Sequence, residues 1–475
     1  MNRNATEENI MNICLLNDSF PPVIDGVVNV VQNYAKYLQS DHGCNVVVGT
    51  PAYPGTNYTA YPYKVVPYQS FDTTAVTSGY RTGNPFAERA VTEMAEFSPD
   101  LIHTHCPATA LVIARILREK TDAPVILTYH TKYDIDIRRN VKLKQVADEG
   151  IRVMVNNIEA CDEVWAVSRG AGESLKALGF RGDYRVMTNG VDFEKGRVSS
   201  EKVAEVTGGY DLPAGIPIFL FVGRMMTYKG LPLILDALKV LSDRGKDFRM
   251  VFVGKGPDQQ LLEKKAQELG IAGKCIFTGP VYDREKLRAW NTRADLFLFP
   301  STFDTNGLVV REAAACGLAS VLIRDSCAAE GITDGRNGFL IEETAEAMAE
   351  LLLKIGGDLP HLHEVGEHAM DEIYLSWEDC VSAAFERYQE ILEAKKSGNL
   401  QRIRRLPTDI LVSMTAHTME EQAKLRRIGS ELFSDFKETA VGMMENIQEA
   451  EESAERFWDT LAEDINRDLE EFYRK

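Results

Sequence analysis

The feature that most constrains this chain is a repeated alternation of short apolar runs with longer amphipathic stretches, which begins at residue 11. The runs are near-continuous in Val, Ile and Leu, as expected for strands of a parallel sheet that is covered on both faces. Stretches such as 26–40 and 108–120 have helical composition. The first series comprises NICLLN (12–17), NVVVGT (45–50), LIHTH (101–105), VILTYH (125–130), EVWAVS (163–168) and YRVMTN (184–189).

The alternation pauses once and then starts again. Residues 194–217 are polar and carry Gly and Pro, which is typical of a connection between domains. A chain of 475 residues is also too long for one ordinary domain. The sequence therefore predicts an α/β protein with two tandem Rossmann-like, doubly wound domains, whose strand carboxyl ends face a cleft. The second series of runs lies at 218–224, 249–256, 275–280, 295–300 and 320–325.

We expect five segments along the chain. The segment 376–396 is predicted to be the helix that closes the second domain. The segments are a disordered N-terminus (1–10), an N-terminal Rossmann-like domain (11–195), a linker (196–217), a C-terminal Rossmann-like domain with its closing helix (218–396) and a helical extension (397–475).

The helical extension differs in composition from the rest of the chain. Pro407 separates a basic stretch, which contains Arg402, Arg404 and Arg405, from acidic segments without strand runs. Apolar residues recur there at helical spacing, so we expect one or two amphipathic helices that pack on the body of the protein or associate with a second copy. These residues are Leu432, Phe433, Phe436, Met443, Ile447, Phe457, Leu461 and Ile465.

Composition excludes several classes of protein. With 44% hydrophobic and 26% charged residues, the chain is typical of a soluble globular protein. Its net charge of −18 argues against non-specific nucleic-acid binding. The 8 cysteines form no Cys-x-x-Cys pair, which indicates free thiols in a reducing compartment. The polar N-terminus and the lack of a long apolar run predict a cytoplasmic protein.

A pair of acids flanks the turn that follows the apolar run 294–300. Asp304 precedes Asn306 and Gly307, and Glu312 lies further along, in a segment of helical composition that ends at Gly317. The free amides of a helix start bind anions, and carboxylates suit hydroxyl groups. This arrangement matches the parts of a nucleotide sugar: Asp304 would bind the sugar hydroxyls, the helix start the diphosphate and Glu312 the ribose hydroxyls. The alternative is a capping Asp304 and a surface Glu312.

Two cations lie in the loop after the run 218–224. Arg224 and Lys229 precede a helix start, where the helix dipole disfavours positive charge. Their presence is explained if an anion binds between them, because a departing diphosphate needs charge neutralisation that fixed cations supply in place of a metal ion. The alternative is a pair of solvated basic side chains.

Taken together, these motifs resemble the family 4 retaining glycosyltransferases, which have the GT-B fold. The similarity covers roughly residues 11–394, and the order and spacing of the motifs are specific although each alone is loose. Many members carry Glu where this chain has Asp304, which leaves the identity of the donor open. The matching motifs are acid-x₇-Glu (Asp304 to Glu312), Gly-Arg…Lys-Gly (223–230), VGKGPDQQLLE (253–263), TNGVD (188–192), FPPVIDGVVNVVQNYAKYL (20–38) and TYHT (128–131).

The resemblance implies transfer of a hexose, with retention, from a nucleotide diphosphate sugar of the UDP-glucose or GDP-mannose type to an acceptor hydroxyl, without a metal or other cofactor. It implies that the first domain binds the acceptor and the second the nucleotide sugar. The implied catalytic residues are His130, Arg224, Lys229 and Asp304. The implied donor-binding residues are Gly26, Gly223, Arg224, Lys229, Gly254, Gly256, Asp304, Asn306, Gly307, Leu308, Val309 and Glu312.

Other interpretations stay open at this point. His130 alone is typical of a core histidine at a strand end. The sequence HTHC, with His103, His105 and Cys106, has no second half of a metal site, so we expect these residues at a strand terminus on the floor of the cleft. A sugar epimerase or a phosphorylase would need further residues that are not evident. A GT-B subunit without activity, which scaffolds a partner, is the alternative outside enzymology.

A local excess of positive charge follows His130 in the segment 131–145. Such an excess in an acidic protein can attract anionic lipid headgroups. Together with the FPP…DGV loop, which resembles that of glycerolipid-directed members, it predicts a peripheral enzyme at the inner face of the membrane that glycosylates a glycolipid, a glycerolipid or a cell-envelope glycan precursor. A soluble saccharide acceptor and an ordinary solvated helix face are the alternatives. The basic residues are Lys132, Arg138, Arg139, Lys142 and Lys144.

Overall fold

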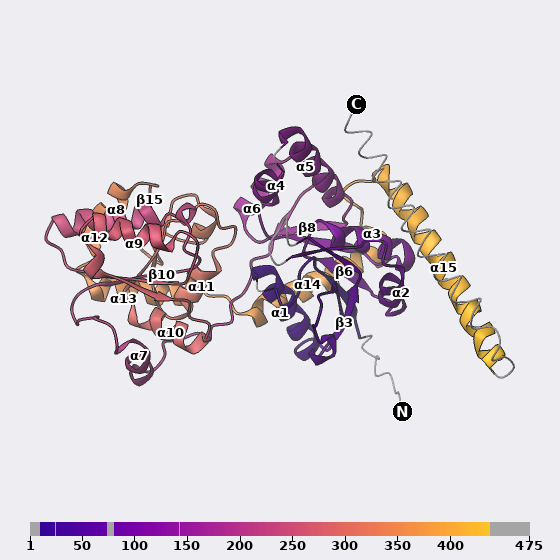
Figure 1. The fold of residues 1–475 in the computed structure, drawn as a ribbon, viewed down its shortest axis with the longest axis horizontal. Coiled ribbons are helices and arrows are strands. Elements are labelled where there is room, and N and C mark those ends of the chain that lie inside the picture. Colours follow the sequence, from indigo (N-terminus) through magenta and orange to yellow (C-terminus); the bar gives the residue numbers. More distant parts are fainter. Residues whose placement is uncertain (1–9, 24, 74–79, 142, 438–475) are drawn as a thin grey trace. The chain divides into compact units, whose positions relative to one another are not determined.

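The computed structural model describes residues 10–23, 25–73, 80–141 and 143–437. In this part of the chain the first sheet has the strand order β3-β2-β1-β6-β7-β8-β9, and all neighbouring strands are parallel. Each run of the first predicted series overlaps one of these strands, although the run 184–189 does so only at Arg185 and Val186. Strands β3, β6 and β8 of this sheet are labelled in Figure 1. The strands are β1 (Asn12–Leu16), β2 (Asn45–Pro51), β3 (Lys64–Tyr68), β6 (Leu101–Thr104), β7 (Val125–Tyr129), β8 (Glu163–Ala166) and β9 (Arg185–Val186).

Alternate residues of the first sheet face opposite helical layers. Ile13 and Leu15 pack on one face with α1 (Gly26–Ser40). Leu16 faces the other side, where a Cβ on Gly49 would lie 2.5 Å from Leu16 and 2.6 Å from Met94 of α2. Both faces are therefore covered, as the apolar runs predicted. The other elements of this domain are β4 (Ser70–Asp72), β5 (Arg81–Gly83), α2 (Glu88–Glu96), α3 (Thr109–Thr121), α4 (Tyr133–Asn140), α5 (Lys144–Glu159) and α6 (Arg169–Ala177).

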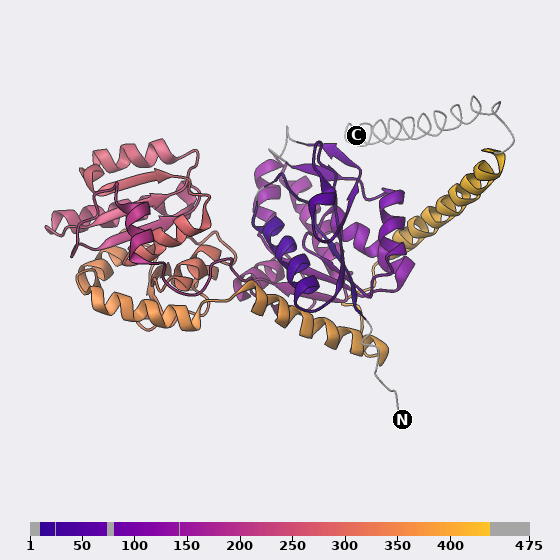
Figure 2. The same cartoon turned by 90° about the horizontal axis from the view of Figure 1, so that it is seen from below.

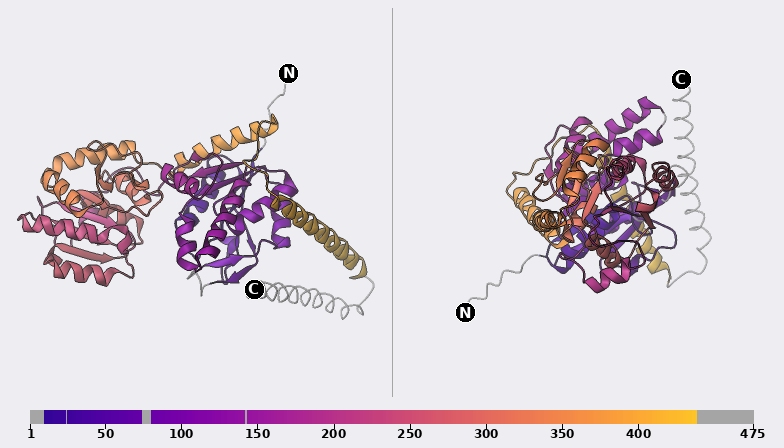
Figure 3. Two further views of the ribbon diagram at one scale, coloured as in Figure 1. Left: turned by 90° about the horizontal axis from the view of Figure 1, so that it is seen from above. Right: turned by 90° about the vertical axis from the view of Figure 1, so that its left-hand side faces the viewer.

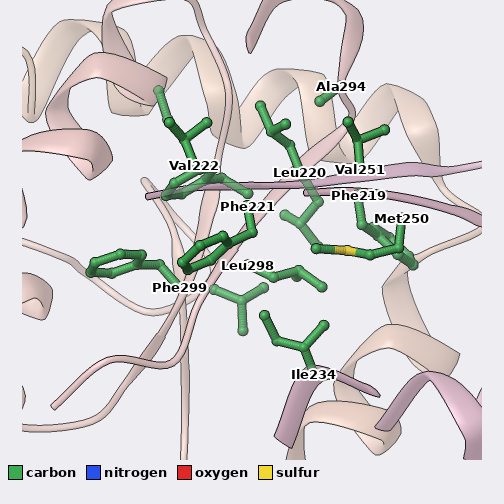
Figure 4. Close-up of a cluster of buried hydrophobic side chains, with 14 of the residues drawn as sticks. Phe219, Leu220, Phe221, Val222, Ile234, Met250, Val251, Ala294, Leu298 and Phe299 are labelled. Carbon is green, nitrogen blue, oxygen red and sulfur yellow. The ribbon is translucent and has the colours of Figure 1, made fainter. Parts of the chain in front are cut away.

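The second sheet is also parallel, in the order β12-β11-β10-β13-β14-β15. All residues of its central strand β10 (Ile218–Val222) are buried, and the rings of Phe221 and Phe299 stack with centroids 6.0 Å apart (Figure 4). The prediction of two doubly wound α/β domains is confirmed. The remaining strands are β11 (Arg249–Val253), β12 (Cys275–Gly279), β13 (Leu296–Phe299), β14 (Ser320–Ile323) and β15 (Phe339–Ile341), and the helices are α8 (Leu231–Asp243), α9 (Gln259–Glu268), α10 (Arg284–Arg293), α11 (Leu308–Ala315), α12 (Ala345–Ile355) and α13 (Leu359–Glu372).

The helix predicted to close the second domain packs on the first domain, so that prediction was wrong. Helix α14 (Trp377–Lys396) shares a buried core with α1 and with strands β1, β2 and β8. Figure 2 shows α14 as the orange helix along the first domain, and the left view of Figure 3 agrees. Its apolar stripe, which includes Trp377, Val381 and Tyr388, identifies a buried face but does not say which sheet that face covers.

The chain crosses between the two sheets twice, and the crossings lie side by side. Val191 forms a parallel bridge with Ser376, and its amide donates to the carbonyl of Leu375 at 3.0 Å. A Cβ on Gly190 would lie 2.4 Å from the carbonyl oxygen of Ser376, so this close approach requires glycine. The predicted linker, 196–217, is not irregular throughout, because it contains helix α7 (Ser200–Thr207).

The chain divides into two compact units after Ala416. Of the second unit, residues 417–437 are described, and they form the later part of helix α15 (Thr408–Lys437). Residues 1–9 of the predicted disordered segment 1–10, and the extension from residue 438, lie outside the described residues. Of the predicted apolar positions, Leu432, Phe433 and Phe436 lie on α15, and Met443, Ile447, Phe457, Leu461 and Ile465 lie outside the described residues.

Candidate functional site

The loops after β10 and β11 pack against each other at the carboxyl edge of the second sheet. A Cβ on Gly254 would lie 1.9 Å from the carbonyl oxygen of Gly223, and one on Gly256 would lie 2.2 Å from that of Met225. Both distances are far below a van der Waals contact, so only glycine allows this approach. Packing between the loops is therefore sufficient to explain these glycines, whatever ligand the loops bind.

Lys229 and Asp304 form an ion pair at this edge. The Lys229 Nζ lies 2.7 Å from Asp304 Oδ1 and 2.9 Å from Oδ2, and the Ser301 hydroxyl donates to the same carboxylate. Their side chains are 12% and 25% exposed, so the pair is accessible but partly shielded from water. Asp304 does not cap α11, whose N-cap is Gly307. The capping alternative for Asp304 is therefore excluded.

Arg224 differs from Lys229 in its surroundings. Its side chain is exposed, and it makes no hydrogen bond or ion pair with any residue that the structure describes. The two cations that were predicted to bind one anion therefore differ in their contacts. Lys229 carries a carboxylate partner that an anion must displace or share, whereas Arg224 is free to move towards a ligand.

Helix α11 begins without a side-chain cap. Gly307 is in the left-handed conformation with φ of 61°, and a Cβ there would lie 2.8 Å from the Cβ of Ala328. No side chain of the described residues accepts a hydrogen bond from the first amides of the helix, those of Leu308 and Val309. Free amides at a helix start suit an anion, and Asp304, the partner of Lys229, precedes them in the β13–α11 loop.

Glu312 lies one turn into α11 and is not a surface charge. Its Oε1 accepts from Arg284 Nη2 at 2.7 Å, and its side chain is 13% exposed. Burial raises the pKa of Glu312, while the positive charge of Arg284 opposes that rise. The surface alternative is therefore excluded, but the carboxylate already has one partner.

Three histidines form a buried group in the first domain. His105 Nδ1 lies 3.0 Å from His130 Nε2, and His103 bonds to the hydroxyls of Tyr388 at 2.5 Å and Thr128 at 2.7 Å. Burial lowers the pKa of His130 to about 3, and lowers the pKa of the other two well below its usual value. The imidazoles are thus neutral near pH 7. His103 lies in the core against α14, contrary to the prediction of a place on the cleft floor.

The loop that carries Asp304 bonds to the first domain. The Thr305 hydroxyl donates to the carbonyl of His130 at 2.6 Å, and Asn306 Nδ2 donates to the carbonyl of Val167 at 2.6 Å. Lys132 Nζ lies 3.5 Å from the carbonyl of Thr302. The carboxyl ends of β7 and β8 therefore meet the β13–α11 loop, so residues 175 positions apart, His130 and Thr305, come together.

The remaining predicted residues lie apart from this contact. Gly26 is the exposed first residue of α1, where the Asp25 carboxylate accepts from the amide of Val28 at 2.7 Å. Arg138, Arg139 and Lys144 are exposed at the end of α4 and the start of α5, and Arg138 pairs with Asp148. Lys142 lies outside the described residues.

Sequence reasoning missed the partners of the predicted residues. Arg284 and Ser301 contact the two acids, and His105 contacts His130. The sequence offered one weak signal, an arginine at the first position of a helix, where the dipole disfavours it. Among the described residues, none of the helices is long and apolar enough to cross a membrane.

Comparison with family models places a match on each domain. Residues 24–195 match the model described as Glycosyltransferase Family 4, and residues 209–371 match the model described as Glycosyl transferases group 1. The two matched ranges contain most strands of the first and second sheets, respectively.

Curated relatives align over most of the chain. The D-inositol 3-phosphate glycosyltransferase 2 of Catenulispora acidiphila is 30% identical over 62% of this chain and 71% of its own length. The sulfoquinovosyl transferase SQD2 of Arabidopsis thaliana is 29% identical over 67% of this chain, which spans 61% of that protein. The alpha-monoglucosyldiacylglycerol synthase of Acholeplasma laidlawii is 23% identical over 72% of this chain and 87% of its own length.

Solved structures share the fold at low sequence identity. Anabaena HepE in complex with UDP superposes with a TM-score of 0.65 at 19% identity and covers 80% of this chain and 100% of its own. Sucrose-phosphate synthase from Thermosynechococcus elongatus has a TM-score of 0.62 at 20% identity and covers 81% of this chain and 100% of its own.

Proposed function

The chain belongs to the family 4 glycosyltransferases of the GT-B fold, and from its site we propose that it moves a hexose, with retention, from a nucleotide diphosphate sugar to an acceptor hydroxyl. One observation carries the proposal. Asp304, which is paired with Lys229 from the β10–α8 loop, lies in the β13–α11 loop that ends at the uncapped start of α11, so a cation, a carboxylate and free amides occur at the same edge of the sheet. A diphosphate linked to a sugar is a ligand that uses all three.

The proposed reaction exchanges one bond at the anomeric carbon. The bond from C1 to the phosphate oxygen breaks, a bond from C1 to the acceptor oxygen forms on the same face, and the departing diphosphate takes the acceptor proton. Arg224, Lys229 and the amides of Gly307 to Val309 hold the negative charge that develops on the diphosphate. We propose that these groups replace a metal ion, so that turnover is the same with and without a chelator of divalent cations.

The imidazole of His130 acts in its uncharged form in this scheme. Because burial lowers the pKa of its imidazole to about 3, it carries no positive charge near pH 7 and does not repel an oxocarbenium-like centre. Its carbonyl bonds to Thr305, next to Asp304 in sequence. We therefore assign His130 to the transferred sugar as a neutral contact, with no proton transfer.

Ligand-induced stabilisation tests the donor class. A ligand at about 100 times its dissociation constant adds roughly 2.7 kcal/mol to the stability of the state it binds. UDP-glucose or GDP-mannose should therefore raise the unfolding temperature, and the one that does identifies the base. If neither these nor other UDP- and GDP-sugars raise it, the chain is better explained as a GT-B subunit that scaffolds a partner.

Replacing Glu312 with alanine should raise the Michaelis constant for the donor more than it lowers turnover. The reason is that a ribose contact is the same in the ground state and the transition state, so it contributes uniform binding. Steady-state kinetics with varied donor give both constants. As a matched control, Glu285→Ala removes an exposed acid of α10 and should change neither. An unaltered donor constant in Glu312→Ala would remove the ribose assignment.

For the acceptor we propose a glycolipid or glycerolipid hydroxyl at an anionic membrane surface, reached from the cytoplasm. The basic side chains Arg139 and Lys144 lie on α4 and α5, where the apolar side chains of Leu143 and Val153 are 70% and 57% exposed. Exposed apolar and basic groups together suit a lipid interface. One relative is named for alpha-monoglucosyldiacylglycerol synthesis, which supports a glycerolipid acceptor. A soluble saccharide is the alternative.

Co-sedimentation with vesicles tests the lipid surface. Binding should need anionic lipid and weaken as salt rises, because salt screens exposed charges. The double change Arg139→Gln with Lys144→Gln should lower partitioning by roughly 30-fold, since each basic residue contributes about 1 kcal/mol. Lys246→Gln, an exposed lysine of the second domain, is the control and should have no effect. Equal binding to neutral and anionic vesicles, or none to either, would leave a soluble acceptor.

A further inference from the structure

Arg284 connects the proposed donor site to the segment that joins the domains. Its Nη2 lies 2.7 Å from Glu312 Oε1 and 3.8 Å from Asp192 Oδ2, and its guanidinium lies over the ring of Phe193 at 4.5 Å from the centroid. Asp192 and Phe193 follow Val191, which forms the bridge to Ser376 at the domain crossing. One side chain thus contacts α11 and the crossing segment together.

The position of Arg284 in its own helix is unfavourable without these partners. It is the first residue of α10, after the N-cap Asp283, and the positive end of a helix dipole disfavours a cation there. The cap bond of Asp283 goes to the amide of Lys286, so it does not account for the arginine. Glu312 and Asp192 supply the negative charge that makes this position stable.

The contact with Glu312 uses one carboxylate oxygen. Arg284 binds Oε1, and no hydrogen bond to Oε2 is formed by the residues that the structure describes. A carboxylate that is bound at one oxygen keeps its second oxygen free to accept from a sugar hydroxyl. In Glu312, therefore, Oε1 is bound to Arg284 and Oε2 is available to accept a hydrogen bond from the ligand.

We propose that Arg284 is a positioning residue for the nucleotide sugar. It holds the carboxylate of Glu312 in place and favours the negatively charged form of that carboxylate. The inference rests on the proposed function, because it takes Glu312 as the ribose ligand. Through Asp192 and Phe193 the same arginine ties that carboxylate to the domain crossing. The orientation of Glu312 thus depends on the position of the crossing segment as well as on α11.

The protonation of Glu312 gives the proposal a distinctive signature. Burial raises the pKa of Glu312, Arg284 lowers it, and Asp192 raises it; the Cys316 thiol, one turn further on at the end of α11, also interacts with this carboxylate. Without Arg284, Glu312 takes up its proton at a higher pH. As pH falls, a variant that lacks Arg284 should therefore lose donor affinity earlier than the unaltered protein.

The test is donor affinity as a function of pH, measured on the full chain with UDP-glucose and GDP-mannose. Between about pH 5 and 8, Arg284→Gln should bind the donor about tenfold more weakly, the scale of one charge-assisted hydrogen bond, and its acidic loss of binding should move to higher pH. Arg284→Lys, which keeps the charge, should recover the pH profile at least in part. Lys286→Gln, an exposed cation of the same helix, is the control and should match the unaltered protein.

The outcomes separate this proposal from the proposed function. If the unaltered chain binds no nucleotide sugar, the donor assignment fails and the role of Arg284 falls with it. If the unaltered chain binds a donor and Arg284→Gln binds it equally well with the same pH profile, Arg284 has no positioning role and the transferase assignment stands. A uniform loss of affinity in both Arg284 variants, without a shift in the pH profile, would also overturn it, since that result indicates general disruption.

Discussion

Replacing Lys229 with alanine is expected to lower turnover by roughly 10²–10³-fold, the loss that follows removal of one preorganised donor to a developing negative charge. Lys229 is the charged donor at this site whose place is already fixed, because its Nζ is held 2.7 Å and 2.9 Å from the two oxygens of Asp304. Removing it takes away a cation for the diphosphate and releases Asp304 from its partner. Steady-state turnover at saturating donor measures the effect.

The controls for Lys229→Ala separate catalysis from folding. Lys239 lies on the following helix and pairs with Asp243 at the surface, so Lys239→Ala should turn over normally. Arg224→Ala should lower turnover on the same scale, because Arg224 is the second cation of the loop. Unfolding temperatures should change little in all three, since partly exposed ion pairs such as those of Lys229 and Lys239 contribute about 1 kcal/mol or less, and Arg224 is exposed without a partner among the described residues. Normal turnover in both Arg224→Ala and Lys229→Ala would show that the loop does not bind the diphosphate.

Replacing Tyr388 with alanine is expected to destabilise the first domain by about 3–5 kcal/mol, as for other large aromatic side chains removed from a core. Tyr388 belongs to α14, yet it is fully buried against the first sheet, stacks on Trp165 with centroids 5.5 Å apart and bonds to His103. Its removal leaves a cavity and an unpaired imidazole nitrogen. Denaturant unfolding followed by tryptophan fluorescence measures the loss, because Trp165 is in contact.

Two further variants make the test of α14 specific. Tyr388→Phe keeps the ring and should cost about 1–3 kcal/mol, the penalty of a buried polar atom without a partner. Tyr282 is 71% exposed, and Tyr282→Ala should change stability by no more than about 0.5 kcal/mol. If Tyr388→Ala left the first domain as stable as before, α14 would not be part of its core.

Most of the fold could be predicted from the sequence because each central strand is a continuous apolar run, and such runs occur where both faces of a sheet are covered. The strands that were missed lack this signal. In β3, Pro67 interrupts an edge strand, and β15 has only 3 residues. The placement of α14 was wrong for a different reason: helical spacing defines an apolar stripe, but the sheet that receives it depends on the path of the chain.

The candidate site was predictable where one loop carries several functional groups. Asp304, Asn306 and Gly307 precede α11, and Arg224 and Lys229 precede α8, so each set could be placed at a strand end. The pairing of Lys229 with Asp304 and of Arg284 with Glu312 could not be predicted, because each joins loops or helices that are distant in sequence. His103 and His105 show the same limit, since the sequence does not reveal which side of the sheet each imidazole faces.

The most direct test of the account is release of nucleoside diphosphate from UDP-glucose or GDP-mannose by the purified chain, with and without diacylglycerol or another lipid acceptor in anionic vesicles. The account predicts that one nucleoside diphosphate appears for each hexose found in the lipid fraction, and that Lys229→Ala lowers both together. The account would be contradicted if the unaltered chain and Lys229→Ala left the same amount of donor intact. That result would have to hold for UDP- and GDP-sugars and with both lipid and saccharide acceptors.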